Sequence, residues 1–410
     1  MPDENHPHPD QGENRHLHSR IEVLLAFLKL GLISFGGPVA HIGYFRDEFV
    51  TRRGWLDNPT YADLVALCQF LPGPASSQVG FSIGLKRAGY FGGLAAWTGF
   101  TLPSAIALVL VALGAHLLTG PLGVGLLHGL KLVAVATVAQ AVLGMARTLC
   151  PDRRRASIAI LALAVILYSS STIAQIGVLL MGAAAGLLMC RTPAPPFMRS
   201  INSGVSRRIG IASLSMFFVL LLLLPLWRKF GAPAWIALLD AFYRSGALVF
   251  GGGHVVLPLL RDAVVAPGWV SDDEFLAGYG AAQAVPGPLF TFAAYLGAVA
   301  EPSAYGLLGA ILGLAGIFLP GMLVLVGALP FWDMICARAD MQGAVRGVNA
   351  SVVGLLGAAL YGPVGTSSIN TWADFAVALM GFLLLACWHV RALLVVLLGA
   401  LAGMALSQVG

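Results

Sequence analysis

The amino-acid sequence predicts an all-α integral membrane protein with about thirteen transmembrane helices, built as two homologous halves that form an inverted repeat with broken helices. Three observations predict this fold class. Hydrophobic residues make up 58% of the 410-residue chain, charged residues make up 10%, and the mean hydropathy is +0.84. Apolar segments of about membrane-span length follow one another along the chain. The motifs that interrupt two of these segments return half a chain later, and the composition excludes an ordinary soluble protein.

The first 20 residues form a polar segment that contrasts with the rest of the chain. They are rich in Pro, His, Asp and Glu, and no positively charged stretch precedes an apolar one, so no cleaved signal peptide is expected. The composition predicts a disordered cytoplasmic tail over residues 1–20. A metal-binding tail is the alternative, since the segment contains His6, His8, His16 and His18.

The first repeat is expected over residues 21–190. Its opening apolar segment, residues 21–45, is interrupted by Phe35-Gly36-Gly37-Pro38, and the next segment, residues 59–88, is interrupted by Pro72-Gly73-Pro74. Each is counted as one broken crossing of the membrane. Four further apolar segments complete the six spans of this half, at about residues 90–118, 122–149, 156–170 and 172–190.

A linker over residues 191–234 contains one connecting transmembrane helix, at about residues 210–227, and leads to the second repeat over residues 235–410. Because a single connecting helix is an odd number, the second repeat is expected to lie upside down relative to the first. This is the inverted-repeat architecture of many secondary transporters.

Matching residues at a nearly constant spacing predict the duplication. Phe35-Gly36-Gly37 returns as Phe250-Gly251-Gly252, 215 positions later, and Pro72-Gly73-Pro74 returns as Pro286-Gly287-Pro288. The spacing is far longer than the repeat of a solenoid protein. The same alignment pairs Arg46 with Arg261, Asp47 with Asp262, Gly54-Trp55 with Gly268-Trp269, Gln69 with Gln283 and Lys131 with Arg346.

Lysine and arginine residues predict the orientation. Arg15 and Arg20, Lys86-Arg87, and the arginines of residues 147–155 and 191–208 fall on one side if the spans alternate, and that side is expected to be the cytoplasm. The N-terminus is then cytoplasmic and the C-terminus periplasmic. The charged loop at residues 46–53 falls outside, against this trend, or folds back into a vestibule.

The breaks indicate a cavity or a tight crossing of chains, because each unpaired backbone group costs several kcal/mol in hydrocarbon. A helix that starts after Pro72-Gly73-Pro74 leaves the amides of Ala75, Ser76 and Ser77 free, and such amides make an anion site. Packing kinks are the alternative. Duplicated broken helices are typical of a transporter's binding site. The backbone and hydroxyl groups expected to line it belong to Gly36, Gly37, Pro38, Pro72, Gly73, Pro74, Ser76, Ser77, Gly251, Gly252, Pro286, Gly287 and Pro288.

Four polar side chains beside the breaks are further candidates. His41 and His254 follow the glycine-rich breaks, where an imidazole is able to donate to an oxyanion or to titrate near neutral pH. A structural role for each histidine is the alternative. Gln69 and Gln283 stand three residues before the Pro-Gly-Pro motifs, on the last turn of a half-helix, where they are expected to donate neutral hydrogen bonds inward.

Charged residues within the apolar segments are costly and usually functional. Lys131 and Arg346 are therefore expected to attract an anionic substrate; snorkelling of Lys131 to the interface is the alternative. Ion pairs between neighbouring residues are candidate gates, with solvated surface pairs as the alternative, and one carboxylate is a candidate for ion coupling. These residues are Arg46 with Asp47, Arg261 with Asp262, and Glu274.

The chain resembles the chromate ion transporter family, in its long, duplicated form, over residues 21–408. The resemblance is carried by Leu30-Gly31, Ser34 to Pro38, Arg52-Arg53-Gly54-Trp55, Gln69 to Pro74, and Phe250 to His254. It implies export of chromate from the bacterial cytoplasm across the inner membrane, chromate resistance, sulfate as a competing anion, and an association with the proton-motive force. The second half departs from the first: Gly253 replaces Pro38, and Leu289-Phe290 replace Ala75-Ser76, which favours a more polar site in the first half.

The membrane potential favours export over uptake. A dianion that leaves an inside-negative cell gains about 4.6 kcal/mol per 100 mV, whereas uptake of sulfate or molybdate needs coupled cations and intramembrane carboxylates, which are few. A sulfate- or molybdate-type transporter and an anion channel are the alternatives.

No haem, iron–sulfur, flavin or HExxH signature is present and the five cysteines lack CxxC spacing, so no enzyme, cofactor or metal site is expected. The lipid bilayer is an expected partner, nucleic acid is not, and a homodimer is compatible with the sequence.

Overall fold

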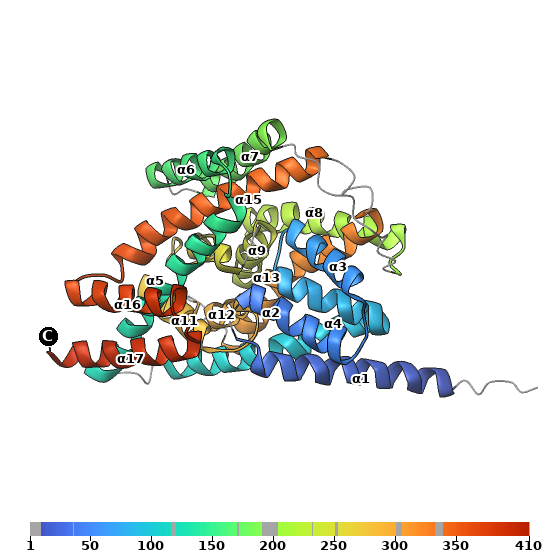
Figure 1. Cartoon of the computed structure of the whole chain (residues 1–410), viewed down its shortest axis with the longest axis horizontal. Helices are drawn as coiled ribbons and strands as arrows, with labels where there is room; N and C mark the ends of the chain where they lie inside the picture. The colour runs from blue at the N-terminus through green and yellow to red at the C-terminus, as the bar shows by residue number, and fades with distance from the viewer. Residues whose placement is uncertain are drawn as a thin grey trace, which may run out of the picture.

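The computed structural model describes residues 10–35, 37–115, 120–169, 172–190, 204–231, 233–250, 253–300, 306–332 and 339–409, and every regular element within these ranges is a helix. Figure 1 shows α6, α7 and α15 along one edge of the molecule and α5, α16 and α17 along another. Helices α9, α12 and α13 lie in the middle of the view, between those helices and α1 to α4.

The first half and the connector contain α1 (Asp10–Ile33), α2 (Gly37–Phe45), the π-helix η1 (Arg46–Arg52), α3 (Asn58–Phe70), α4 (Ala75–Ala115), α5 (Pro121–Leu149), α6 (Arg153–Tyr168), α7 (Thr172–Met189) and α8 (Arg207–Lys229). The second half contains α9 (Ala234–Ala247), η2 (Gly253–Val255), α10 (Val256–Val264), α11 (Asp272–Ala284), η3 (Leu289–Thr291), α12 (Phe292–Val299), α13 (Leu307–Ala328), η4 (Leu329–Phe331), α15 (Ala339–Ala359), η5 (Leu360–Gly365), α16 (Trp372–Ala386) and α17 (Ala392–Val409).

The first helix begins earlier than the sequence predicts. Helix α1 starts at Asp10, so residues 10–20 form its first turns. The prediction of a disordered tail is therefore wrong for residues 10–20. The reason is local: the segment contains no proline after Pro9 and consists mainly of residues that tolerate a helix. Residues 1–9 lie outside the described residues.

The broken apolar segment at residues 21–45 folds back on itself. Lys29 Nζ lies 3.2 Å from Glu48 Oε2, Arg53 Nη1 lies 3.2 Å from Glu22 Oε1, and the Phe27 and Phe49 rings stack at 4.7 Å. These pairs place η1 and the residues after it antiparallel to α1, with the break at the tip. The prediction that this segment makes one crossing is therefore wrong, because its two arms form a hairpin.

The charged loop after η1 lies beside the start of α1. The Arg53 and Arg87 guanidinium groups lie 5.2 and 5.0 Å from the Trp55 ring, and both arginines pair with Glu22. The loop thus shares one side of the molecule with Lys86-Arg87. The expectation that it lies on the opposite side, against the charge trend, is wrong, and the hairpin explains why.

The other three broken segments are also pairs of short helices. Helix α3 packs against the first arm of α4, which itself bends at Ala88 and Gly89, where the backbone is not helical. In the second half, Ser245 Oγ on α9 donates to the Leu259 carbonyl on α10 at 3.3 Å. Tyr295 on α12 donates to the Glu274 carbonyl at the start of α11, at 3.2 Å.

Helices long and apolar enough to cross a membrane occur in both halves. The five long ones among the described residues are Ala75–Gly114, Leu122–Leu149, Arg207–Lys229, Leu307–Phe331 and Asp340–Gly362. Shorter apolar helices are Ile173–Met189, Leu289–Val299, Trp372–Ala386 and Ala392–Gln408. The chain is thus a helical membrane protein.

Helices of the two halves pack against each other at pairs of glycines. Gly125 and Gly129 of α5 contact Gly403 and Gly399 of α17. In the same way Gly182 and Gly186 of α7 contact Gly347 and Gly343 of α15. Glycines four residues apart let helix backbones approach closely. Four such motifs, one on each of these helices, therefore tie the long helix of each half to the last helix of the other half.

These contacts correct one pairing in the repeat. Since Gly125-Leu126-Leu127-His128-Gly129 occupies the place of Gly343-Ala344-Val345-Arg346-Gly347, the counterpart of Arg346 is His128. Lys131 then corresponds to Asn349. The constant spacing fails here because the second half has gained four residues between the Pro-Gly-Pro motif and this helix: the spacing is 286 − 72 = 214 at the motif and 343 − 125 = 218 at the helix.

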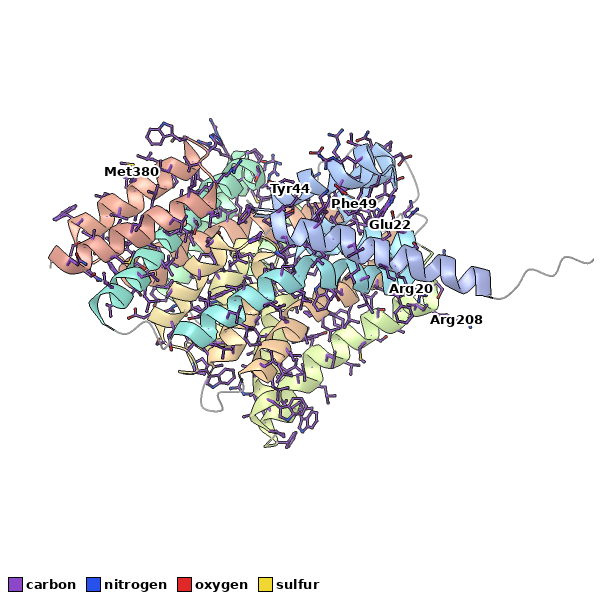
Figure 2. All side chains as sticks on the ribbon, turned by 90° about the horizontal axis from the view of Figure 1, so that it is seen from below. Arg20, Glu22, Tyr44, Phe49, Arg208 and Met380 are labelled. Carbon is purple, nitrogen blue, oxygen red and sulfur yellow. The ribbon has the colours of Figure 1, made fainter. Side chains whose placement is uncertain are left out.

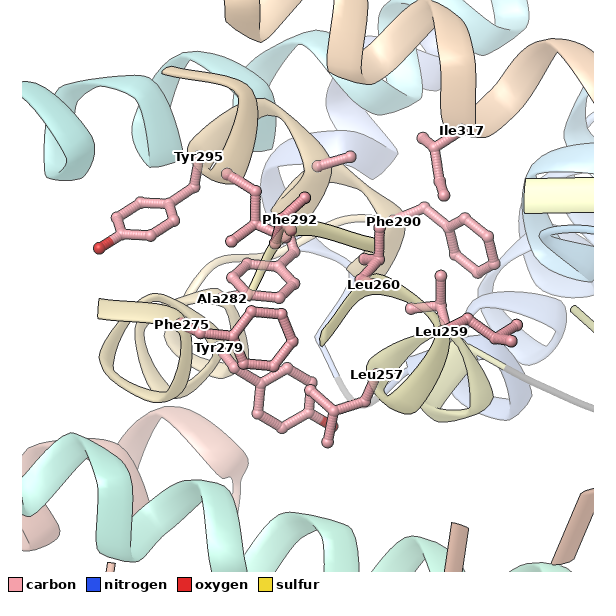
Figure 3. Close-up of a cluster of buried hydrophobic side chains, with 14 of the residues drawn as sticks. Leu257, Leu259, Leu260, Phe275, Tyr279, Ala282, Phe290, Phe292, Tyr295 and Ile317 are labelled. Carbon is pink, nitrogen blue, oxygen red and sulfur yellow. The ribbon is translucent and has the colours of Figure 1, made fainter. Parts of the chain in front are cut away.

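A large cluster of buried apolar side chains lies mainly in the second half. The outer helices expose apolar side chains. Figure 3 shows rings from α11, η3 and α12 together with leucines from α10; Phe275 and Phe292 lie 5.2 Å apart. On the outside, Met380 is 54% exposed, and Figure 2 shows it far from Arg20 and Arg208. Exposed apolar side chains on long helices are what a lipid-facing surface requires.

Glu48 is expected to stabilise the hairpin of α1 and η1. Its side chain is only 7% exposed and accepts from Arg53 at 2.9 Å and from Lys29 at 3.2 Å. Although burial opposes ionisation, these hydrogen bonds hold the pKa of Glu48 below the usual 4.5. Glu48→Gln is expected to lower the free energy of unfolding by about 2 kcal/mol.

The effect depends on pH. Because the folded-state pKa is depressed, the stabilisation is fully present above about pH 4.5 and is lost as the pH falls through the lowered pKa. Thermal unfolding in detergent, from pH 8 down to well below pH 4.5, measures it. A Glu48→Gln protein as stable as the wild type at pH 7 contradicts the assignment.

Candidate anion-binding site

The four breaks meet through two equivalent backbone hydrogen bonds. Gly73 N donates to the Val249 carbonyl at 2.7 Å, and Gly287 N donates to the Ser34 carbonyl at 2.9 Å. Val249 and Ser34 stand directly before the two Phe-Gly-Gly motifs. Each Pro-Gly-Pro tip is therefore fastened to the glycine-rich tip of the other half.

Both donors must be glycine. Gly73 and Gly287 have φ values of +119° and +107°, which favour glycine. A Cβ on Gly73 would lie 2.8 Å from Gly321 Cα, and a Cβ on Gly287 would lie 2.8 Å from Ser104 Oγ. The motif is thus needed for close backbone approach, as the sequence predicts for a tight crossing.

A buried polar cluster surrounds the start of α4. Pro74 precedes the helix and its carbonyl accepts the first bond, from Gln78 N at 2.9 Å, which leaves the amides of Ala75 to Ser77 without intrahelical acceptors. His41 Nδ1 lies 3.4 Å from Ser76 Oγ. Among the described residues the polar atoms without a hydrogen-bond partner here are Ser34 Oγ, His41 Nε2, Ser77 Oγ and Gln78 Oε1.

The second half has no equivalent polar start. The Pro288 carbonyl accepts from Thr291 N at 3.0 Å and from Thr291 Oγ1 at 2.7 Å, which closes a tight η3 turn. Phe290 is buried in the apolar interior. The two halves thus differ in polarity as their sequences do at these positions.

A cavity of about 720 Å³ adjoins the joined tips. It is bounded by α1 and α2 around the first break, by the second Pro-Gly-Pro tip, by α5, and by the turn between α16 and α17. Gln283 Nε2 is buried beside it without a hydrogen-bond partner in the described part of the chain. The polar and charged residues in its wall are Tyr44, Thr137, Gln140, Gln283, His389 and Arg391.

The structure brings part of the predicted site together. Gly37, Pro38, Gln283 and Gly287 line the cavity, and His41, Ser76 and Ser77 form the neighbouring polar cluster. Gln69 is exposed rather than inward-facing. Pro72, Pro286 and Pro288 shape the tips; Gly36, Gly251, Gly252 and the His254 side chain lie outside the described residues.

The predicted cationic pair does not meet at the cavity. Lys131 Nζ lies 2.7 Å from Asp273 Oδ1, a carboxylate that is 75% exposed, which favours the snorkelling alternative. Arg346 Nη1 donates to the Cys190 carbonyl at the end of α7, at 3.0 Å. Neither residue lines the cavity, and Arg391 supplies a cation there instead.

The predicted ion pairs between neighbours do not form. Arg46 donates to Asn58 Oδ1 at 3.0 Å, and Arg261 binds both oxygens of Asp272 at 2.8 and 3.0 Å, while Asp262 accepts from Gln175. Consecutive helical side chains point in different directions, so Arg46 cannot face Asp47 nor Arg261 face Asp262. Glu274 forms a capping box with Ser271 at the start of α11.

Sequence reasoning missed several residues that the folded chain places at the candidate site or at contacts between the halves. Gln78, Gln140 and Arg391 carry no local signal, because their positions depend on packing between the halves. His128 on α5 pairs with Asp374 on α16, with 2.6 Å between Nε2 and Oδ1. The four glycine motifs with four-residue spacing were the available signal for the helix pairs.

Comparisons with known proteins agree with this architecture. The family model described as chromate transporter matches residues 21–187 and again residues 236–404. A chromate transport protein from Pseudomonas aeruginosa is 28% identical over 350 residues, covering 82% of this chain and 79% of that protein. A probable chromate transport protein from Synechococcus elongatus is 27% identical over 392 residues, covering 92% and 93%.

An uncharacterized transporter from Methanocaldococcus jannaschii is 26% identical over 354 residues, covering 85% of each chain. No solved structure matches the chain. The family model covers most of the chain and matches both halves, which carry the same broken-helix motifs. The chain therefore belongs to the chromate transporter family, in its long, duplicated form.

Proposed function

We propose that this protein is a secondary transporter that exports chromate, a tetrahedral oxyanion, from the bacterial cytoplasm and so gives chromate resistance. The observation that carries the proposal is the 720 Å³ cavity beside the crossed tips, with the buried Gln283 Nε2 and the Arg391 cation in its wall. A dianion needs donors and a positive charge, and the wall offers both.

We propose an inverted arrangement of the repeats, residues 21–190 and 235–410. The support is that the two halves start at different ends of the molecule. The first half starts beside Arg87 and Trp55. The second half starts at the C-terminal end of α8, where Arg228 lies 3.9 Å from Asp240 and 5.7 Å from the Trp269 ring. The broken segments then enter the membrane as hairpins. The second arm of α4, α5 to α8, α13 and α15 to α17 cross it.

The arginine-rich side is cytoplasmic in this arrangement. The N-terminus then lies in the cytoplasm and the C-terminus in the periplasm. The turn that carries His389 and Arg391 joins the ends of α16 and α17 on the cytoplasmic side, so the cavity faces the cytoplasm. Chromate enters past Arg391 and reaches Gln283 at the crossed tips, next to the free amides at the start of α4.

The membrane potential drives the dianion outward, worth about 4.6 kcal/mol per 100 mV. Proton coupling through His41 or His254 is an additional route for the proton-motive force. Sulfate has the same tetrahedral shape and charge and competes for the site. A sulfate- or molybdate-type transporter and an anion channel are the alternative functions.

Substitutions in the cavity wall test the site. Gln283→Ala and Arg391→Gln are each expected to raise the KM for chromate about tenfold, since each removes a donor to a charged group. Lys131→Gln is the matched control, because Lys131 pairs with Asp273 away from the cavity, and it is expected to change KM less than about twofold.

The measurement is the initial rate of labelled chromate uptake into inverted vesicles, with sulfate as competitor and the rate normalised to protein. Saturation and sulfate inhibition favour a carrier over a pore. Unchanged KM in both cavity variants, or a large effect of Lys131→Gln alone, contradicts the assigned site.

A further inference from the structure

A second cleft, of about 410 Å³, lies where α6 begins and α7 ends. Its wall contains Arg153, Arg154 and Arg155 of α6, Arg346 of α15, and one carboxylate, Asp152. Asp152 caps α6 and pairs with Arg155, with 2.6 Å between its Oδ2 and Nε. Hydrogen bonds from Arg155 hold the pKa of Asp152 below its usual range, so it stays ionised.

Two of the four arginines in the cleft wall bind backbone carbonyl groups. Arg154 donates to the Met189 carbonyl at 2.8 Å and Arg346 donates to the Cys190 carbonyl at 3.0 Å, so both satisfy the end of α7. Among the described residues that line the cleft there are four guanidinium groups and one carboxylate, and each guanidinium has five N–H donors.

The equivalent place in the other half shows that the fold does not require this charge. There His128 stands in place of Arg346 and pairs with Asp374 at the start of α16. Asp374 also accepts from the backbone of Asn370 and Thr371 at 3.0 and 2.9 Å. That corner is closed by its own carboxylate, whereas the one carboxylate among the described residues that line the cleft beside α6, Asp152, pairs with Arg155.

We propose that this cleft binds a phosphate group, supplied either by the headgroup of an anionic phospholipid or by free phosphate. Arginine binds phosphate oxygens through paired N–H donors, and four arginines line this cleft. Leu188 and Met189, beside the cleft, are 77% and 44% exposed, which gives acyl chains an apolar surface. Basic pockets between transmembrane helices recognise headgroups in this way.

The test is lipid retention by the purified full-length protein, measured by native mass spectrometry in an equal mixture of phosphatidylglycerol and phosphatidylcholine. The test variant, Arg153→Gln with Arg155→Gln, leaves the two arginines that hold the end of α7. The matched control, Arg207→Gln with Arg208→Gln, removes two exposed arginines at the start of α8. Each arginine lost from the cleft is expected to lower phosphatidylglycerol retention on the order of fivefold.

Two further arms identify the source of the phosphate. If millimolar inorganic phosphate displaces the lipid and raises the wild-type unfolding temperature, the cleft is a free-phosphate site; if only phosphatidylglycerol raises it, the cleft is a lipid site. The thermal arm uses the wild type and does not depend on the variant folding. Equal retention by wild type and cleft variant, or stabilisation by neither phosphate source, overturns the proposal.

Discussion

Replacement of Gly347 by leucine is expected to prevent the protein from reaching its folded state. A Cβ at this position would overlap the Gly182 carbonyl oxygen and crowd the backbone of Gly186, neither of which is a flexible side-chain end. Inserting a side chain into such a contact costs more than about 3 kcal/mol, a large part of the stability of a typical domain. The same result is expected for Gly129→Leu, which overlaps the Gly399 carbonyl in the equivalent pair.

Gly177→Leu on α7 is the control, since a Cβ there meets nothing within 4 Å. The readout is the yield of monodisperse protein in detergent and its unfolding temperature. We expect Gly177→Leu to match the wild type and both crossing variants to aggregate or to unfold far earlier. Normal yield and stability of Gly347→Leu would show that α7 and α15 do not cross at these glycines.

Gly73→Ala is expected to lower chromate transport at least tenfold. The new Cβ would strain the backbone at φ +119° and crowd both Gly321 Cα, at 2.8 Å, and Gln78 Nε2, at 2.9 Å. Strain of about 1–3 kcal/mol opens the bond to the Val249 carbonyl and releases the crossed tips. Transport is measured as uptake into inverted vesicles.

The control for this prediction is Gly54→Ala. Gly54 also has a positive φ, +60°, but a Cβ there meets nothing within 4 Å, so it separates backbone strain from crowding. We expect it to lose about 1–2 kcal/mol of stability and to keep its transport rate. If Gly73→Ala transports as well as Gly54→Ala, the crossed tips are not part of the transport pathway.

The sequence alone is sufficient to predict the helical membrane class, the duplication and the positions of all four breaks. These follow from composition and from residues such as Gly73 and Pro74, whose backbone preferences act locally. It could not predict that the segment before Glu48 folds back, because a hairpin and a crossing have the same apolar pattern. The contacts that decide between them join Glu22 and Lys29 to residues that follow the break.

The site was predictable only in part for the same reason. Gly37, Gln283 and Gly287 belong to motifs that mark the breaks, whereas Arg391 lies in a short turn that reaches the cavity only through the packing of α16 and α17 against α5. For Lys131 the sequence predicted a role at the site that the structure does not support. The charge lies within an apolar segment, but its side chain reaches the exposed Asp273 carboxylate.

The most direct test of the proposed export is labelled chromate uptake into inverted membrane vesicles under imposed potentials of both signs. If the protein exports a dianion along the membrane potential, an inside-positive potential drives saturable, sulfate-sensitive accumulation above that of vesicles lacking the protein, and an inside-negative potential suppresses it. Accumulation equal to that of empty vesicles under both potentials would contradict chromate export by this chain.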